Sequence, residues 1–151
     1  MHAYSEAYLK EVVETQGKLF DEVAEYEPGI NVSCFIRDYM MSKTREHIDQ
    51  GQAYVATMDA EDLWNYFCKI ENYKPVKGEA LRGFMADWIG QFYAYFQWYY
   101  NISSKKVLEL VPLNFIKIAY HGLHDLELEL AVKKVGGQVA VQSDYLLSQS
   151  K

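Results

Sequence analysis

The sequence is poor in the features that mark several large classes of protein. It has two cysteines, Cys34 and Cys68, which lie within apolar helical patterns and make no metal-binding spacing. Free thiols in a reducing cytoplasm are the expected state, although a single disulfide stays open. No segment approaches the roughly 20 apolar residues of a membrane span, and the N-terminus lacks the apolar segment of a signal peptide. We therefore expect a cytoplasmic protein without a membrane partner.

Positive charge is also scarce. The chain has 15 Lys and Arg residues against 21 Asp and Glu residues, which gives a formal net charge of −6. Adjacent basic residues occur only at Lys105-Lys106 and Lys133-Lys134. Affinity for nucleic acid comes largely from clustered Lys and Arg side chains that neutralise phosphates. We therefore expect no direct binding of nucleic acid.

Motifs of catalysis and of cofactor binding are missing as well: the sequence has no nucleophile elbow, no P-loop and no dinucleotide-binding glycine motif. The nearest approach to a metal or acid–base cluster is His121 and His124, followed by Asp125 and Glu127. A two-histidine zinc site needs a continuous helix and a further ligand, whereas Gly122 is expected to break this helix. We predict no catalytic residue, no metal and no cofactor, with capping and polar structural roles for His124 and Asp125.

What the chain does have is aromatic side chains. Half of its 151 residues are hydrophobic, enough for the core of one domain, and nine of its 23 aromatic residues lie in segment 84–100. On a helix that turns about 100° per residue, most of these aromatics share one half. We expect a buried central helix over 81–100, with this core set: Trp88, Phe92, Tyr95, Phe96 and Tyr99.

The other side of this helix is lined by small and polar residues. Gly90, Ala94 and Gln97 lie there, with Trp98 on its shoulder. Small residues let a neighbouring backbone approach closely, and Trp is enriched among binding hot spots. We therefore take these four residues as the candidate partner-binding site, which accepts a helix of the protein itself or of a partner.

The remaining segments predict shorter helices that pack around the central one. The predicted features are a helix over about 5–26, a second one capped by Asn31 or Ser33 that carries residues to Ile48, a connector at 52–58, a third helix capped by Asp59, a break at 73–78, a short helix capped by Ser103 or Ser104, and another capped by Asn114 and broken by Gly122. This pattern predicts an all-α fold, an irregular bundle of about six to seven helices.

The end of the chain is ambiguous. Segment 126–130 alternates Leu and Glu, and Gly136-Gly137 would suit the turn of a hairpin. Leu, Glu, Ala and Lys are nonetheless good helix formers, and an isolated two-stranded ribbon is marginally stable. We favour a helix over 125–135 and leave the hairpin open for 125–140. We expect one helical domain at 1–135 and a tail at 136–151 that is loosely ordered or packed on it.

The aromatic segment resembles one known family. Trp88 and Gly90, followed by the run AYFQWY at 94–99, are similar to the W-x-G-W-x-L-A-Y-Y-Q-W-Y pattern of a helical N-terminal domain in Firmicutes regulators of the Xre helix-turn-helix class. The weaker points of similarity are Phe35-Ile36, Met58 with Glu61 and Leu63, and Leu123-His124-Asp125. The resemblance spans roughly residues 8 to 135, and its only specific part is the aromatic segment.

The resemblance implies an antitoxin-like or regulatory role, because such regulators are encoded beside ADP-ribosyltransferase-like toxins. Segment 135–151 is too short for a helix-turn-helix domain, so the resemblance extends only to the partner-binding domain. It carries over no catalytic residue. Our first hypothesis is a non-catalytic protein that binds and neutralises a partner toxin, with the acidic face of the first helix steering a basic partner. A homodimer stays open.

Two alternatives belong to other classes. One is a small enzyme or ligand-binding protein with a pocket near Tyr95, Gln97 and His124, which would need convergent polar groups and a titratable residue with a perturbed pKa. The other is an acidic inhibitor that mimics nucleic acid, which would need carboxylates at phosphate-like spacing on one exposed face.

Overall fold

The chain folds into an irregular bundle of helices, which confirms the predicted all-α class. The structure is a computed structural model that describes residues 3–26, 29–78, 81 and 83–150, with side chains as far as Val139. No strand occurs in this described part. Its elements are the 3₁₀-helix η1 (Glu6–Tyr8) and the α-helices α1 (Leu9–Ala24), α2 (Val32–Met40), α3 (Lys43–Asp49), α4 (Ala53–Ala56), α5 (Ala60–Glu71), α6 (Met85–Tyr100), α7 (Ser104–Leu110), α8 (Leu113–Leu123) and α9 (Leu128–Ser150).

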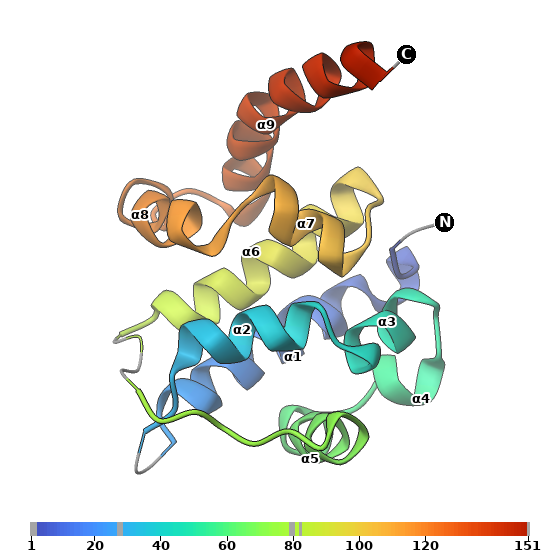
Figure 1. Cartoon of the computed structure of the whole chain (residues 1–151), viewed down its shortest axis with the longest axis vertical. Helices are drawn as coiled ribbons and strands as arrows, with labels where there is room; N and C mark the ends of the chain where they lie inside the picture. The colour runs from blue at the N-terminus through green and yellow to red at the C-terminus, as the bar shows by residue number, and fades with distance from the viewer. Residues whose placement is uncertain (1–2, 27–28, 79–80, 82, 151) are drawn as a thin grey trace.

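The aromatic helix α6 lies at the centre of the bundle, side by side with α1 (Figure 1). Helices α2 to α5 cover one side of this pair, and α7 to α9 cover the other. Among the described residues, the contact between α1 and α6 is the most extensive helix–helix contact. Both helices therefore bury most of their circumference, as expected for the centre of a bundle.

Side-chain caps set several helix starts at predicted positions. The Asn31 side chain accepts a hydrogen bond from the backbone N–H of Cys34, and Asp59 accepts one from that of Asp62. Ser103 accepts one from Lys106 at the start of α7. Each cap satisfies a backbone N–H that the first turn of a helix leaves without a partner. The three caps confirm the starts predicted at Asn31, Asp59 and Ser103.

The second predicted helix is in fact two helices, α2 and α3, because a further cap lies inside it. Ser42 Oγ accepts a hydrogen bond from the Arg45 backbone N–H and donates one to the Tyr39 carbonyl oxygen. One side chain thus ends α2 and starts α3. The predicted connector at 52–58 contains the short helix α4.

The predicted break at Gly122 is absent, which is a correction, and the hairpin that was left open for 125–140 is absent too. Gly122 lies inside α8, which begins after Pro112 as its N-cap and continues to Leu123, so neither the break at Gly122 nor the cap at Asn114 is observed. Gly136 and Gly137 lie inside α9, so the hairpin is wrong and the helix over this segment is right. Gly136 leaves room for the Tyr100 ring, because a Cβ atom there would lie 1.8 Å from Tyr100 Oη unless that side chain shifted.

Candidate functional site

The small-residue strip of α6 is filled by the protein's own helix α1. A Cβ atom at Gly90 would lie 2.6 Å from the backbone oxygen of Gln16 and 2.8 Å from Gly17 Cα, so the two backbones touch here. Ala94 and Gln97 are fully buried. These three candidate residues thus lie inside the protein, where a partner does not reach them. We predicted that this strip accepts a helix of the protein itself or of a partner, and the helix that packs there is α1.

Trp98, the fourth candidate residue, lies half-buried in an aromatic group near the C-terminal end of α6. Its ring packs edge to face on Tyr95, with the ring centroids 5.7 Å apart. Tyr99 was expected in the core but is 40% exposed, and the Lys133 ammonium lies 5.8 Å from its ring centroid. The hydrogen bond that Lys133 donates to Glu129 raises the pKa of this lysine.

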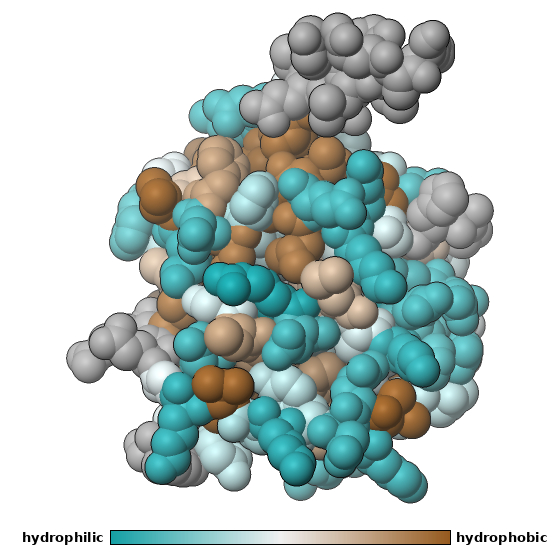
Figure 2. Space-filling model, viewed as in Figure 1, coloured by the Kyte–Doolittle hydropathy of each residue, from teal (hydrophilic) through white to brown (hydrophobic). Residues whose placement is uncertain are grey.

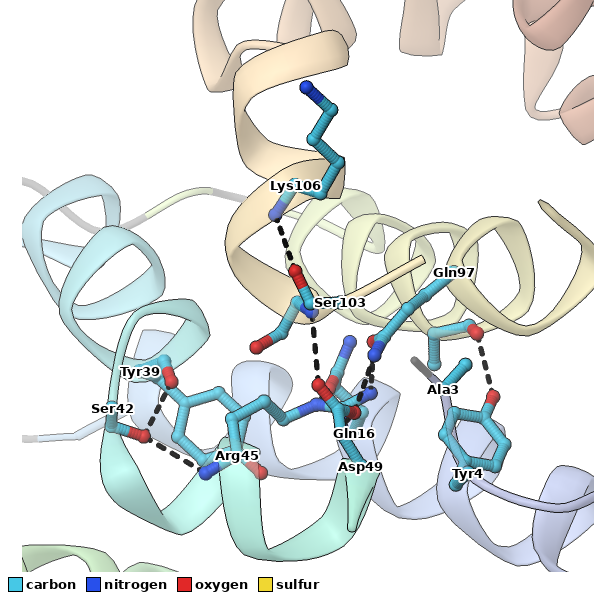
Figure 3. A network of polar contacts seen from close by, with 12 residues as sticks. Ala3, Tyr4, Gln16, Tyr39, Ser42, Arg45, Asp49, Gln97, Ser103 and Lys106 are labelled. Carbon is cyan, nitrogen blue, oxygen red and sulfur yellow. Dashed lines mark hydrogen bonds and ion pairs between the residues drawn. The ribbon is translucent and has the colours of Figure 1, made fainter. Parts of the chain in front are cut away.

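Behind the filled strip lies a buried polar network centred on Arg45, a fully buried side chain of α3 (Figure 3). Its guanidinium donates from Nε to Gln16 Oε1 at 2.7 Å, from Nη1 to Asp49 Oδ1 at 2.6 Å, and from Nη2 to Gln97 Oε1 at 2.7 Å. The Tyr4 ring packs against the same guanidinium, with Arg45 Cζ 5.6 Å from the centroid of the ring. Every face of the cation is therefore occupied by the protein itself.

The carboxylate of Asp49 completes this network. Its Oδ1 also accepts a hydrogen bond from Gln97 Nε2, and its Oδ2 accepts one from the Ser104 backbone N–H at 3.0 Å. The network thus joins α1, α3, α6 and the start of α7. A buried charge costs free energy unless it is paired and hydrogen-bonded. Here the Arg45 guanidinium and the Asp49 carboxylate are paired with each other, and both are hydrogen-bonded to further groups. The arrangement holds four helices together and presents no group to a substrate.

Tyr4 ties the N-terminal segment into the same centre. Its hydroxyl donates to the carbonyl oxygen of Ala94 at 2.6 Å. Burial raises the pKa of Tyr4 well above its usual value, against the lowering effect of the Arg45 charge. The phenol therefore stays protonated and acts as a hydrogen-bond donor.

Sequence reasoning missed Arg45 and Asp49, although two patterns pointed to them. The pair is spaced i, i+4, which brings the two side chains together on one helix face. Gln16 stands within the apolar repeat of the first helix, and a polar residue on an apolar face usually has a buried partner. Which partner it meets depends on tertiary packing, so the network itself could not be derived.

The remaining candidates lie apart from one another. His124 ends α8, where its Nδ1 donates to the Tyr120 carbonyl oxygen at 2.9 Å and its ring stacks on the Tyr120 ring. Asp125 lies 3.3 Å from His124 Nε2 and is otherwise exposed. Since Gln97 is enclosed in the Arg45 network and Tyr95 packs on Trp98, the structure does not bring Tyr95, Gln97 and His124 into one pocket.

The described residues contain neither a candidate metal site nor a candidate membrane span. Within that part of the chain, no three His, Cys, Asp or Glu side chains come together in a group that could hold a metal ion. In the same residues, no helix combines the length and the apolar character that crossing a membrane requires.

An open apolar groove lies between α8 and α9 and has a volume of about 460 Å³. Its lining residues are Phe115, Ile118, Ala119, Gly122, Leu123, Lys134, Val135 and Gln138. Four of them follow an i, i+3, i+4, i+7 spacing along α8, which places them on one helix face. Ile118 is 77% exposed and Phe115 is 39% exposed. Figure 2 shows hydrophobic residues gathered around the base of α9.

Comparison with protein-family models, with curated proteins and with solved structures finds no match to this chain.

The chemistry of the groove is that of an apolar contact surface. Among the described residues that line it, Lys134 is the one titratable residue and Gln138 adds an amide. General acid–base work needs a positioned pair of groups with suitable pKa values, which this lining does not provide. An apolar helix face on a partner would instead find an apolar floor with a polar rim.

Proposed function

We propose that this protein is a non-catalytic interaction protein that binds a partner protein through the groove between α8 and α9. The observation that carries the proposal is the uncovered apolar stripe of α8. Ile118 and Phe115 are solvent-exposed on that helix, although its other face is buried through Leu113 and Ile116. A contiguous apolar surface rimmed by polar residues is the usual mark of an interaction site.

The partner that we propose is an ADP-ribosyltransferase-like toxin encoded by the adjacent gene, and binding would neutralise it. The resemblance of the aromatic segment to antitoxin-like regulators supports this choice. The net charge of −6 adds support, because an acidic surface speeds the encounter with a basic partner. The charge also favours a protein partner over a nucleic acid.

Co-expression with the product of the neighbouring gene tests this function. We expect the two proteins to elute together and the protein to restore growth of cells that express the toxin. Ile118→Glu should abolish both effects, because it places a charge at the centre of the contact while leaving the core intact. Replacing an exposed side chain outside the core changes the free energy of unfolding by only about 0.5 kcal/mol.

Ile70→Glu is the matched control. Ile70 is 41% exposed and lies on α5, away from the groove, so the same chemical change there should leave co-elution and growth rescue intact. Separate elution of the wild-type proteins without rescue would refute the proposed partner. Equal loss in both variants would show that the groove is not the contact surface.

A further inference from the structure

A second pocket lies between α1 and α5 and has a different chemistry. It has a volume of about 150 Å³ and is lined by Leu19, Glu22, Val23, Tyr26, Glu61 and Trp64. Its floor is the buried pair Leu19 and Val23. Drug-sized ligands occupy pockets of about 300–1,000 Å³, so this volume suits one side chain of a partner.

Two carboxylates and two aromatic rings surround the apolar floor. Glu22 lies in the last turn of α1 and Tyr26 follows the end of that helix, whereas Glu61 and Trp64 come from α5 at an i, i+3 spacing. Both carboxylates are exposed, and Tyr26 is 50% exposed. The rim is therefore negative and aromatic on both sides of the pocket.

Neither carboxylate has a cationic partner among the described residues. In the described part of the chain, no Lys, Arg or His side chain lies within ion-pair distance of Glu22 or Glu61. Lys18, one turn before Glu22 on α1, also makes no such pair. The negative charge at this rim is therefore open to a cation from outside.

The protein itself shows what such a combination binds. Arg45 lies against the Tyr4 ring and pairs with Asp49. Lys133 lies over the Tyr99 ring and pairs with Glu129. In both cases a cation is held by a tyrosine ring together with a carboxylate. The pocket between α1 and α5 contains the same two kinds of group, with Glu61 and Trp64 on α5, Glu22 on α1 and Tyr26 just after the end of α1.

We propose that this pocket binds an arginine side chain of a partner protein. The methylene stem packs on Leu19 and Val23, and the planar guanidinium stacks on an aromatic ring while its N–H groups reach the carboxylates of Glu22 and Glu61. Arg suits this site better than Lys, because its flat fork pairs with carboxylates and stacks on rings at the same time. The proposal uses a different surface from the α8–α9 groove and does not rest on the function proposed above.

Solution NMR on the full chain, with a short synthetic peptide as the probe, tests the pocket. The peptide acetyl-Gly-Arg-Gly-amide is titrated into the labelled protein, and the Trp64 indole N–H and the backbone N–H of Glu22 are followed. We expect saturable shifts at both signals. The matching lysine peptide should bind several-fold more weakly, and the norleucine peptide should give no saturable shift.

A pair of charge-matched variants makes the test specific. Glu22→Gln with Glu61→Gln should weaken binding of the arginine peptide at least tenfold. Glu11→Gln with Glu14→Gln removes the same charge from exposed positions of α1 outside the pocket, and it should leave the affinity within twofold. Equal weakening by both pairs would overturn the proposal, because the peptide would then sense only overall charge. Equal binding of the norleucine peptide would also overturn it.

Discussion

At the scale of single residues, the structure depends on Arg45, which has no solvent contact and yet carries a full charge. Gln16, Asp49 and Gln97 supply the oxygen atoms that its guanidinium needs. A buried ion pair adds little net stability, but removing one partner leaves the other charge buried without compensation. Arg45 is therefore a position where a single substitution has a large effect.

We predict that Arg45→Met lowers the free energy of unfolding by about 3–5 kcal/mol, because it strands the Asp49 carboxylate. Urea denaturation measures this loss. Arg37→Met is the control, since Arg37 is exposed on α2 and its replacement should cost less than about 0.5 kcal/mol. A loss of similar size in both variants would contradict the role assigned to the network.

Asp21 on α1 gives a prediction that depends on pH. Partial burial, together with the nearby charges of Glu25 and Asp87, raises its pKa above the usual value. The folded state thus binds the Asp21 proton more tightly than the unfolded state does. The stability that this proton adds is fully present below the pKa that Asp21 has in the unfolded chain. It is lost as pH rises through the pKa that Asp21 has in the folded protein.

At pH 7 the ionised Asp21 therefore lowers stability, and Asp21→Asn should raise the Tm. Because the group is partly exposed, screening limits the gain to a few tenths of a kcal/mol, or roughly 1 °C for a chain of this length. The gain should shrink as pH falls below about 4, where the unfolded aspartate is also protonated. Thermal melts at pH 7 and pH 3.5 check this, and an equal gain at both would be inconsistent with it.

At the scale of helices, the crossing of α1 and α6 determines how the bundle is built. Gly90 brings the α6 backbone against Gln16 and Gly17 of α1. This close approach lets the Gln16 side chain donate to the Gly90 carbonyl oxygen at 2.8 Å. The same side chain accepts from Arg45, so the packing of two helices and the buried network depend on one glycine.

Gly90→Ala should accordingly destabilise the protein by roughly 1–3 kcal/mol, the usual cost of overpacking a tight core. The control is Gly137→Ala in α9, where an added Cβ atom meets nothing within 4 Å. There the better helix propensity of Ala should raise stability by up to about 1 kcal/mol. Equal effects of the two substitutions in chemical denaturation would argue against the tight crossing.

The helices that could be predicted from sequence are those whose signals are local. Asn31, Asp59 and Ser103 cap helices through bonds to backbone N–H groups three residues away, so their roles are readable from the chain alone. The role of Gly136 was ambiguous because it depends on a residue far away in the sequence. The Tyr100 ring packs where a side chain at position 136 would be. The split at Ser42 was missed although its signal is equally local, because Ser42 Oγ accepts from the Arg45 backbone N–H three residues further on.

The candidate sites were harder to predict for a related reason. A helical wheel orders the residues of α6 correctly around the axis, but it does not say which side another helix covers. Gly90, Ala94 and Gln97 thus looked available, although α1 packs on Gly90, and Ala94 and Gln97 are buried inside the protein. Conversely, Phe115 and Ile118 look like ordinary core residues in the sequence, and only the fold shows that they are exposed.

At the scale of the whole molecule, the two proposed contact surfaces lie apart. The groove is formed by α8 and α9, and the charged pocket is formed in part by α5, at the end of the molecule opposite α9 (Figure 1). One surface is apolar and the other is acidic and aromatic. A single partner that used both would have to wrap around the bundle, so the two surfaces suit separate contacts.

The α8–α9 groove is the surface through which we propose that this protein binds a partner protein. Hydrogen–deuterium exchange on the co-purified complex measures this most directly, because it reports which backbone N–H groups become protected on binding. We predict that added protection concentrates in residues 115–138, which carry the groove lining. Protection confined to other helices, with α8 and α9 exchanging as in the free protein, would contradict the claim.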